Sequence, residues 1–309
     1  MIPEDVARPS SRAWTELLHA EVAYLLRTAG IDVLHIKGPT VALWLYEEGE
    51  RAWGDVDVMV APSQMRDALA VLRERGLVEK YPGVTQGTTE DHSVVLARTD
   101  PTIGFDEVDL HERFPGMEVD PERAFDELWR RREPAQLAHV DVWFPDLTTR
   151  ALLIALHTAR STTSPKARTD LLRLLDPASE VDWEDVVLLA RRVGGLPALR
   201  AGLELEPAGR DVVQATPLRD TPVSVAWRLR VQRAPKTAER LEQLGQTPWR
   251  SRPATVARWV LPAPAVMRMR DPGAAAGPRP LVAAYARRLL GGARGLPHAY
   301  RVLRDASRS

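Results

Sequence analysis

The alternation of apolar and polar positions divides the chain into a first part with strands and helices and a second part with helices alone. Apolar residues recur at helical spacing over 11–29 and 62–75, whereas the run at 55–60 alternates strictly, as a half-buried strand does. The same criteria predict strands at 31–36, 92–98, 105–111 and 137–143 and helices at 38–48 and 121–132. Strands interleaved with helices in this order predict an α/β (α+β) domain, with a mixed sheet flanked by helices on one face.

After residue 145 the pattern predicts helices and no strand. The helices are expected at 147–160, 166–175, 183–193, 197–205, 221–234, 236–244 and 281–291, with a Gly- and Ala-rich loop at 272–280. Twelve of the 25 prolines follow residue 206, which marks a change in composition toward the end of the chain. We therefore expect two domains, an α/β domain over 1–146 and an all-helical, basic domain over 147–309.

The composition is that of a folded protein with its own core. The chain has 309 residues, of which 44% are hydrophobic, and it has no cysteine, which excludes thiol nucleophiles, thiolate metal sites and a disulfide scaffold. No apolar run approaches the roughly 18 residues that span a bilayer. The first residues are acidic and lack the apolar segment of a secretory signal, so a cytoplasmic protein is expected.

The 42 basic and 42 acidic residues cancel in total but are unevenly distributed. Residues 1–206 hold 36 acidic and 23 basic side chains, whereas residues 207–309 hold 6 acidic and 19 basic ones. This asymmetry indicates either a basic surface for an anionic partner or two halves that attract each other. Lysine is scarce among the basic residues, with only Lys37, Lys80, Lys166 and Lys236.

Two aspartates stand two residues apart in the predicted strand at 55–60. Residues i and i+2 of a strand face the same side, so Asp55 and Asp57 present adjacent carboxylates and the valines between and after them face the core. Adjacent carboxylates repel unless a cation lies between them, and Mg²⁺ with oxygen ligands is the natural occupant. The alternative is that both aspartates lie on a solvated edge.

A second predicted strand, at 105–111, ends in Asp109 and His111. If it pairs beside 55–60, Asp109 completes a cluster of three carboxylates and His111 lies on the same face. Three carboxylates on neighbouring strands are what two metal ions need for phosphoryl or nucleotidyl transfer, in which one ion activates the attacking oxygen and the other neutralises the leaving phosphates. For His111 the alternative is a packed strand histidine.

The predicted strand 31–36 runs directly into Lys37 and Gly38 at the start of a helix. A strand-to-helix turn with glycine presents backbone N–H groups that favour phosphate, and Lys37 adds a positive charge suited to a triphosphate. The alternative is an ordinary helix entry.

Taken in order, the motifs of the first part resemble the bacterial nucleotidyltransferase-like proteins described as uncharacterised nucleotidyltransferases, within the DNA polymerase beta-like nucleotidyltransferase superfamily. The motifs are Lys37-Gly38, Leu45-Tyr46, Arg51-x-x-Gly54-Asp55-Val-Asp57-Val-Met-Val60, Asp91-His92, Val108-Asp109-Leu-His111, Leu152–His157, Asp170-Leu-Leu and Asp182–Ala190. The resemblance covers most of residues 15–195, and residues 207–309 match only loosely.

The resemblance implies metal-dependent transfer of a nucleoside monophosphate from an NTP to an acceptor, with release of pyrophosphate. It implies that Asp55 and Asp57 bind Mg²⁺ or Mn²⁺, as two ions, and that Asp109 is the third carboxylate, which helps to deprotonate the acceptor hydroxyl. The nucleotide and its phosphates are assigned to Lys37, Gly38, Thr40, Arg51, Gly54 and His111. The wider superfamily has Gly-Ser where this chain has Lys-Gly, which leaves open whether Thr40 replaces the serine.

Four further residues carry weaker signals. Arg51 either reaches a phosphate or pairs with the acidic cluster. His92 is expected in mid-strand with a structural role, and His157 is expected on an apolar helix face as a core histidine. Asp170 either forms a salt bridge with Arg168 or faces the cleft.

We therefore expect a nucleotidyltransferase that acts on an NTP and on a hydroxyl or amine of a small molecule, peptide or protein. One alternative is a non-catalytic protein that holds a nucleotide or nucleic acid on this fold, and another is transfer to an RNA 3′ end. Nucleic acid is the less expected partner, because the basic part is expected to pack against the acidic domain. The sequence has no Walker A loop, Gly-x-Ser-x-Gly elbow or His-Glu-x-x-His pair to support other chemistries.

Overall fold

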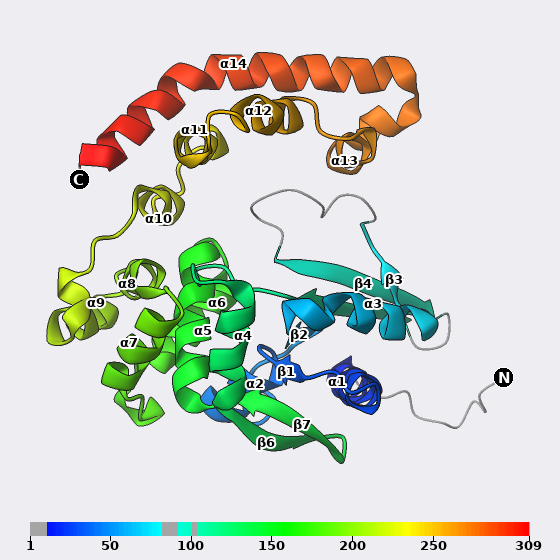
Figure 1. The fold of residues 1–309 in the computed structure, drawn as a ribbon, viewed down its shortest axis with the longest axis vertical. Helices are drawn as coiled ribbons and strands as arrows, with labels where there is room; N and C mark the ends of the chain where they lie inside the picture. Colours follow the sequence, from blue (N-terminus) through cyan, green and yellow to red (C-terminus); the bar gives the residue numbers. More distant parts are fainter. Residues whose placement is uncertain (1–10, 82–91, 101–103, 309) are drawn as a thin grey trace. The chain divides into compact units, whose positions relative to one another are not determined.

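A mixed sheet lies at the centre of the first of two units, Met1–Thr221, in a computed structural model that describes residues 11–81, 92–100 and 104–308. The strand order is β1-β2-β5-β4-β3, with β2 parallel to β5 and the other neighbours antiparallel. Figure 1 labels all of these strands except β5. The strands are β1 Val33–His35, β2 Val56–Val60, β3 Val78–Glu79, β4 Ser93–Asp100 and β5 Gly104–His111. The predicted mixed sheet is confirmed.

One face of the sheet is apolar and carries the main core. The valines of β2 point to the same side as Val108 and Leu110 of β5, and all of these side chains are fully buried. Helices α1 (Ser11–Thr28) and α3 (Met65–Glu74) pack on this face, with the 3-10 turn η1 (Pro62–Gln64) leading into α3. Because side chains alternate along a strand, the intervening residues of β2 and β5 point to the opposite face.

A β-hairpin stands where a single strand over 137–143 was predicted, and that prediction is wrong. Strands β6 (Arg132–Leu137) and β7 (Val140–Pro145) are joined at Ala138 and His139, whose φ angles are +45° and +64°. Left-handed conformations at both central residues match the twist of two-residue hairpins. Neither residue is the Gly or Asn that marks such turns in a sequence, so no local sequence pattern indicated that the chain reverses here.

Side-chain caps begin several helices of the first unit. Asp146 accepts a hydrogen bond from the backbone N–H of Thr149, and Ser164 accepts one from that of Ala167, which satisfies N–H groups at the starts of two helices that flank the site described below. The helices of this unit besides α1 and α3 are α2 Pro39–Leu45, α4 Pro121–Arg130, α5 Leu147–Arg160, α6 Pro165–Leu174, α7 Trp183–Arg192, α8 Leu196–Leu203 and α9 Pro207–Ala215, with 3-10 turns η2 Pro177–Ser179 and η3 Pro217–Asp220.

The first unit therefore holds both the sheet and the helices that follow it as far as Thr221. The predicted division after residue 146 lies inside this unit. The second unit, Pro222–Ser309, contains 17 of the basic residues and 4 of the acidic ones, so the charge asymmetry of the sequence coincides with the division into units.

The second unit is helical throughout its described part, as predicted for the end of the chain. Its elements are α10 Val225–Val231, α11 Lys236–Gln246, α12 Arg252–Val260, α13 Pro264–Arg270, η4 Pro272–Ala276 and α14 Pro278–Arg308. The helix predicted at 281–291 is only the first part of α14, which continues through Gly291, Gly292 and Pro297. None of the helices in the described ranges combines the length and the apolar composition that a membrane-spanning segment requires.

Candidate active site

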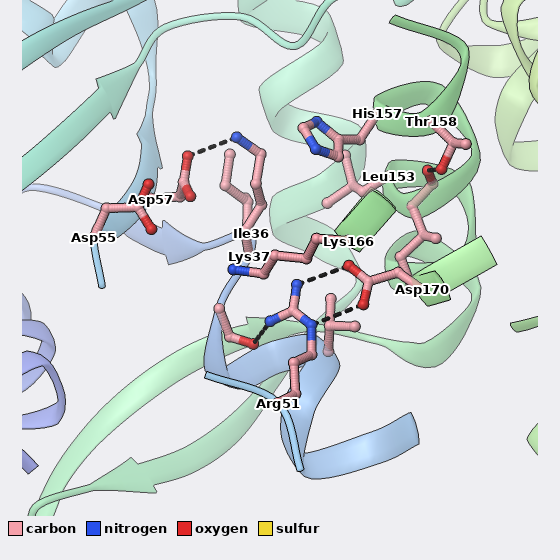
Figure 2. Close-up of a pocket in the computed structure, with 13 residues that line it drawn as sticks. Ile36, Lys37, Arg51, Asp55, Asp57, Leu153, His157, Thr158, Lys166 and Asp170 are labelled. Atoms are coloured by element: carbon pink, nitrogen blue, oxygen red, sulfur yellow. Dashed lines mark hydrogen bonds and ion pairs between the residues drawn. The ribbon is translucent and has the colours of Figure 1, made fainter. Parts of the chain in front are cut away.

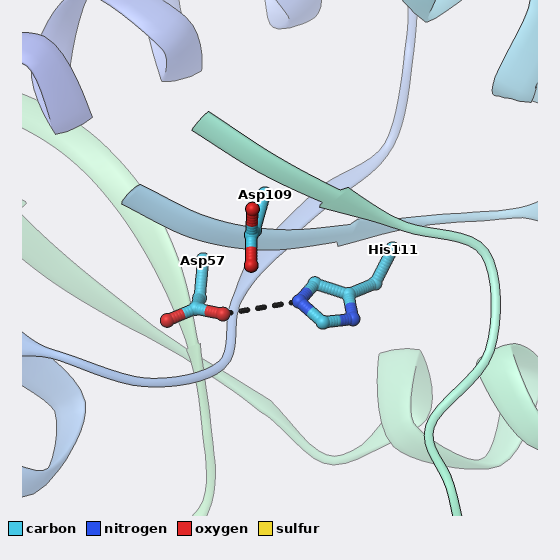
Figure 3. Close-up of side chains that lie close together, drawn as sticks. All are labelled: Asp57, Asp109 and His111. Carbon is cyan, nitrogen blue, oxygen red and sulfur yellow. Dashed lines mark hydrogen bonds and ion pairs between the residues drawn. The ribbon is translucent and has the colours of Figure 1, made fainter. Parts of the chain in front are cut away.

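Two carboxylates and a histidine come together on the sheet face opposite α1 and α3. The register of the parallel strands places Asp57 of β2 beside Asp109 of β5, and His111 follows Asp109 by two residues on the same face. One ligand atom from each of the three side chains lies within 4.8 Å of the others (Figure 3). The strand pairing on which the carboxylate hypothesis depended is therefore present.

Asp57 has the most partners of the three side chains. Its Oδ1 atom lies 2.6 Å from Nζ of Lys37 and 3.0 Å from Nε2 of His111. Burial alone raises the pKa of a carboxyl group, but the positive charge of Lys37 and the hydrogen bond from His111 outweigh it and hold the pKa of Asp57 well below its usual range. Asp57 is therefore ionised, and its negative charge is balanced by the Lys37 ammonium.

Asp109 and His111 each have one buried polar atom without a hydrogen-bond partner among the described residues. These atoms are Oδ1 of Asp109 and Nδ1 of His111. Burial and then the charge of Asp57 raise the pKa of Asp109 to about 7, and burial lowers the pKa of His111 to about 4, so the imidazole is neutral at pH 7. Buried polar atoms are normally satisfied, so the free oxygen of Asp109, which lies beside Asp57, marks a place that a ligand can complete.

A pocket of about 130 Å³ opens beside Asp57 (Figure 2). Its walls come from the turn after β1, the segment leading into β2, and helices α5 and α6. The lining residues are Ile36, Lys37, Gly38, Val41, Arg51, Asp55, Asp57, Leu153, Ile154, His157, Thr158, Lys166 and Asp170. Basic and acidic side chains thus face one small space, as a site for a charged ligand and a cation requires.

The residues that form this site lie within a segment that matches a known protein family. Residues 11–207, which include the whole pocket and the Asp57–Asp109–His111 cluster, match the family described as "Uncharacterised nucleotidyltransferase". The chain belongs to this family. A solved structure of an antigenic nucleotidyltransferase-like protein from Paracoccidioides brasiliensis is similar, with 15% identity and a TM-score of 0.42, over 68% of this chain and 96% of that one. No curated protein matched the sequence.

In this member of the nucleotidyltransferase family, Arg51 pairs with a carboxylate outside the predicted acidic cluster. Its Nε and one terminal nitrogen donate to the two oxygens of Asp170 at 2.8 and 2.7 Å, and its other terminal nitrogen donates to the carbonyl of Gly38 at 2.9 Å. The hydroxyl of Tyr46 also donates to Asp170, at 2.6 Å. The proposed Asp170–Arg168 salt bridge is wrong, because Arg168 pairs with Glu206. Asp170 instead lies in the pocket wall.

The pocket of this family member contains two side chains that sequence reasoning missed. Lys166, at the start of α6, is exposed and extends toward the space beside Asp55 and Asp57 (Figure 2). His157 was expected in the core but is half-buried in the pocket wall, where burial and the nearby Lys37 lower its pKa to about 3. The scarcity of lysine was the one sequence signal that pointed to Lys166.

The residues assigned to the phosphate turn lie in different environments. Gly38 lines the pocket with a φ of +64°, a left-handed conformation that favours glycine. Thr40 is fully buried in α2 and does not line the pocket. Gly54 is exposed beside Asp55, which does line the pocket and whose pKa is raised by burial and by Asp57.

His92 was expected in mid-strand, and this prediction is wrong. It precedes the first residue of β4, and its ring lies 5.2 Å from that of His111. Its Nε2 is 2.5 Å from a terminal nitrogen of Arg160 at the end of α5. This contact joins the sheet to the helix that carries His157.

Proposed function

We propose that the protein transfers a nucleoside monophosphate from an NTP to a hydroxyl or amine acceptor and releases pyrophosphate. The observation that supports this most is the register that sets Asp57 beside Asp109, next to a pocket lined with lysines. In the reaction, the bond between the α-phosphorus and the oxygen bridging to the β-phosphate breaks. A bond from the acceptor oxygen or nitrogen to the α-phosphorus forms, and the acceptor proton passes to Asp109.

The residues present fit a hard divalent cation. Asp57, Asp109 and His111 offer oxygen and nitrogen ligands within 4.8 Å, and one oxygen of Asp109 is buried without a partner among the described residues. We assign these side chains, with Asp55 beside them, to Mg²⁺ or Mn²⁺, and the number of carboxylates suits two ions. When bound, such ions supply charge neutralisation at the phosphates and activation of the attacking oxygen.

The basic side chains of the pocket divide into two roles. Lys37 and Lys166 are assigned to the triphosphate, because both line the pocket beside Asp55 and Asp57. Bound cations would neutralise these carboxylates, and the two ammonium groups could then pair with phosphates. Arg51 has its guanidinium nitrogens engaged by Asp170 and Gly38, so it holds the pocket wall in place and is a positioning residue. His157 completes the opposite wall.

The proposal is tested first by nucleotide binding, which needs no acceptor. Calorimetry with non-hydrolysable NTP analogues should show tighter binding with Mg²⁺ than without it. Asp57→Asn and Asp109→Asn should each remove this Mg²⁺-dependent gain, by about tenfold or more in affinity. The matched control is Asp67→Asn, an exposed aspartate on α3 that should leave binding unchanged.

Transfer is tested with NTPs labelled at the α-phosphate, offered together with candidate acceptors, with pyrophosphate measured in parallel. The expected result is label in the acceptor and equimolar pyrophosphate, both lost in Asp55→Ala and Asp57→Ala. Equal transfer by parent and variants contradicts the assignment. Magnesium-dependent binding with no transfer to hydroxyl, amine or RNA acceptors would identify a nucleotide-binding protein without this catalysis.

A further inference from the structure

Helix α14 exposes a stripe of apolar side chains that is separate from the candidate active site. The stripe runs along the helix with alternate spacings of four and three residues, and its members are Val282, Ala286, Leu289, Ala293, Leu296 and Tyr300. Its four larger side chains are between 43 and 67% exposed. At 3.6 residues per turn this spacing keeps the side chains on one side of the helix over a length of about 27 Å.

A row of arginines follows the stripe on one side. Arg287, Arg294, Arg301 and Arg308 recur every seven residues, and all four are exposed. Seven residues are close to two turns, so the guanidinium groups are about 10 Å apart along the axis. Arg287 pairs with Asp271, whereas the other three form no ion pair with any described residue.

The stripe is not the face that holds α14 in its own unit. The buried residues of the helix are Ala284, Ala299 and Ala306, which lie between about 100° and 160° around the helix axis from the centre of the stripe. They pack with α10 and α11 near the end of the helix and with α13 and η4 near its start. Packing within the unit therefore leaves the stripe and the arginine row exposed together.

We propose that α14 lies along an anionic lipid surface, with the apolar stripe at the acyl-chain boundary and the arginine row among the headgroups. Charge complementarity favours an anionic occupant, because residues 222–309 hold 17 basic and 4 acidic side chains. Aliphatic residues on one side and arginines beside them are the features of helices that lie in a membrane interface. A nucleic acid matches less well, because Tyr300 is the one aromatic member of the stripe and aliphatic side chains give bases no stacking surface.

The test uses the full chain and vesicles. Flotation is measured with vesicles of phosphatidylcholine alone and of phosphatidylcholine mixed with phosphatidylglycerol. The protein should float only with the mixed vesicles, and added salt should weaken binding. Leu289→Ser with Leu296→Ser, and separately Arg294→Gln with Arg301→Gln and Arg308→Gln, should each lower the affinity about tenfold or more.

Matched controls come from the first unit. Leu172→Ser with Leu188→Ser changes two leucines that are 46 and 51% exposed, and Arg66→Gln changes an exposed arginine, so all should leave flotation unchanged. Circular dichroism of every variant checks that the helices remain. Asp57→Asn should also float normally, which separates this inference from the proposed transferase activity.

Three results would overturn the lipid assignment. The first is no flotation of the parent with mixed vesicles, and the second is unchanged flotation of the α14 variants. The third is arginine-dependent binding of poly(U) RNA, or a dimer that the leucine substitutions dissociate, in protein that does not bind vesicles. That third result would assign the surface to nucleic acid or to a second copy of the chain.

Discussion

The buried ion pair between Arg51 and Asp170 gives a quantitative test of how the pocket wall is held. Both side chains are less than 10% exposed, and the two hydrogen bonds between them are 2.8 and 2.7 Å long. Removing one partner leaves the other charge buried without compensation, which costs about 3–5 kcal/mol of unfolding free energy. We therefore expect Asp170→Ala to destabilise the protein by this amount. Tyr46→Phe, which removes one hydrogen bond to Asp170, should cost about 1 kcal/mol.

The assay is urea unfolding followed by tryptophan fluorescence, since six of the nine tryptophans lie in residues 1–221. With a slope of about 2–3 kcal/mol per molar, Asp170→Ala should lower the midpoint by more than about 1 M. The double variant Arg51→Met with Asp170→Leu should lose less than the sum of the single losses, because it removes both charges. A loss below about 1 kcal/mol for Asp170→Ala, or strict additivity in the double variant, would refute this reasoning.

Two further predictions concern stability. Burial lowers the pKa of His19, which is hydrogen-bonded to His35 in the core, to about 4. The unfolded chain therefore binds a proton at His19 that the folded chain does not, and His19 should contribute about 3 kcal/mol to the loss of unfolding free energy as pH drops from about 6.5 to 4. A urea midpoint that stays constant over this range, or that falls equally in His19→Gln, contradicts the assignment. At Gly202 an added Cβ would collide with the carbonyl oxygen of Ala155 on α5, so Gly202→Ala should cost about 2 kcal/mol in thermal unfolding. Gly245→Ala, in a helix with open space around it, should stabilise by up to about 1 kcal/mol, and equal effects at the two glycines would show that helix packing is not the cause.

Local patterns were most informative where an element buries one face. The strict alternation around Asp57 predicted which residues of β2 face the core, because a strand with one buried face cannot shift by one residue without exposing its valines. The order of motifs along residues 15–195 likewise predicted the family that matches residues 11–207. Local patterns failed where packing overrides propensity. Helix α14 continues through two glycines and a proline, and Ala284 and Ala299, on either side of them, are buried against neighbouring helices.

The site shows the same division between local and long-range information. Asp57 and Asp109 were identified from their strands, but only the sheet register shows that they are direct neighbours. Nothing near Asp170 in the sequence predicted its pairing with Arg51, which lies 119 residues away. The apolar helix face around His157 predicted a position in the core. The side chain instead borders a pocket whose other wall comes from the turn after β1.

By itself, the sequence determined the mixed α/β architecture, the carboxylate-bearing strands and the family, since these depend on periodicity and on short motifs that neighbouring residues define. Only the tertiary structure decided which charges are paired and which remain available. It pairs Lys37 with Asp57 and Arg51 with Asp170, and it leaves an oxygen of Asp109 without a partner among the described residues. The physical reason is that Coulomb interactions, desolvation and hydrogen bonds depend on distances across the fold, and these distances have no counterpart in residue spacing.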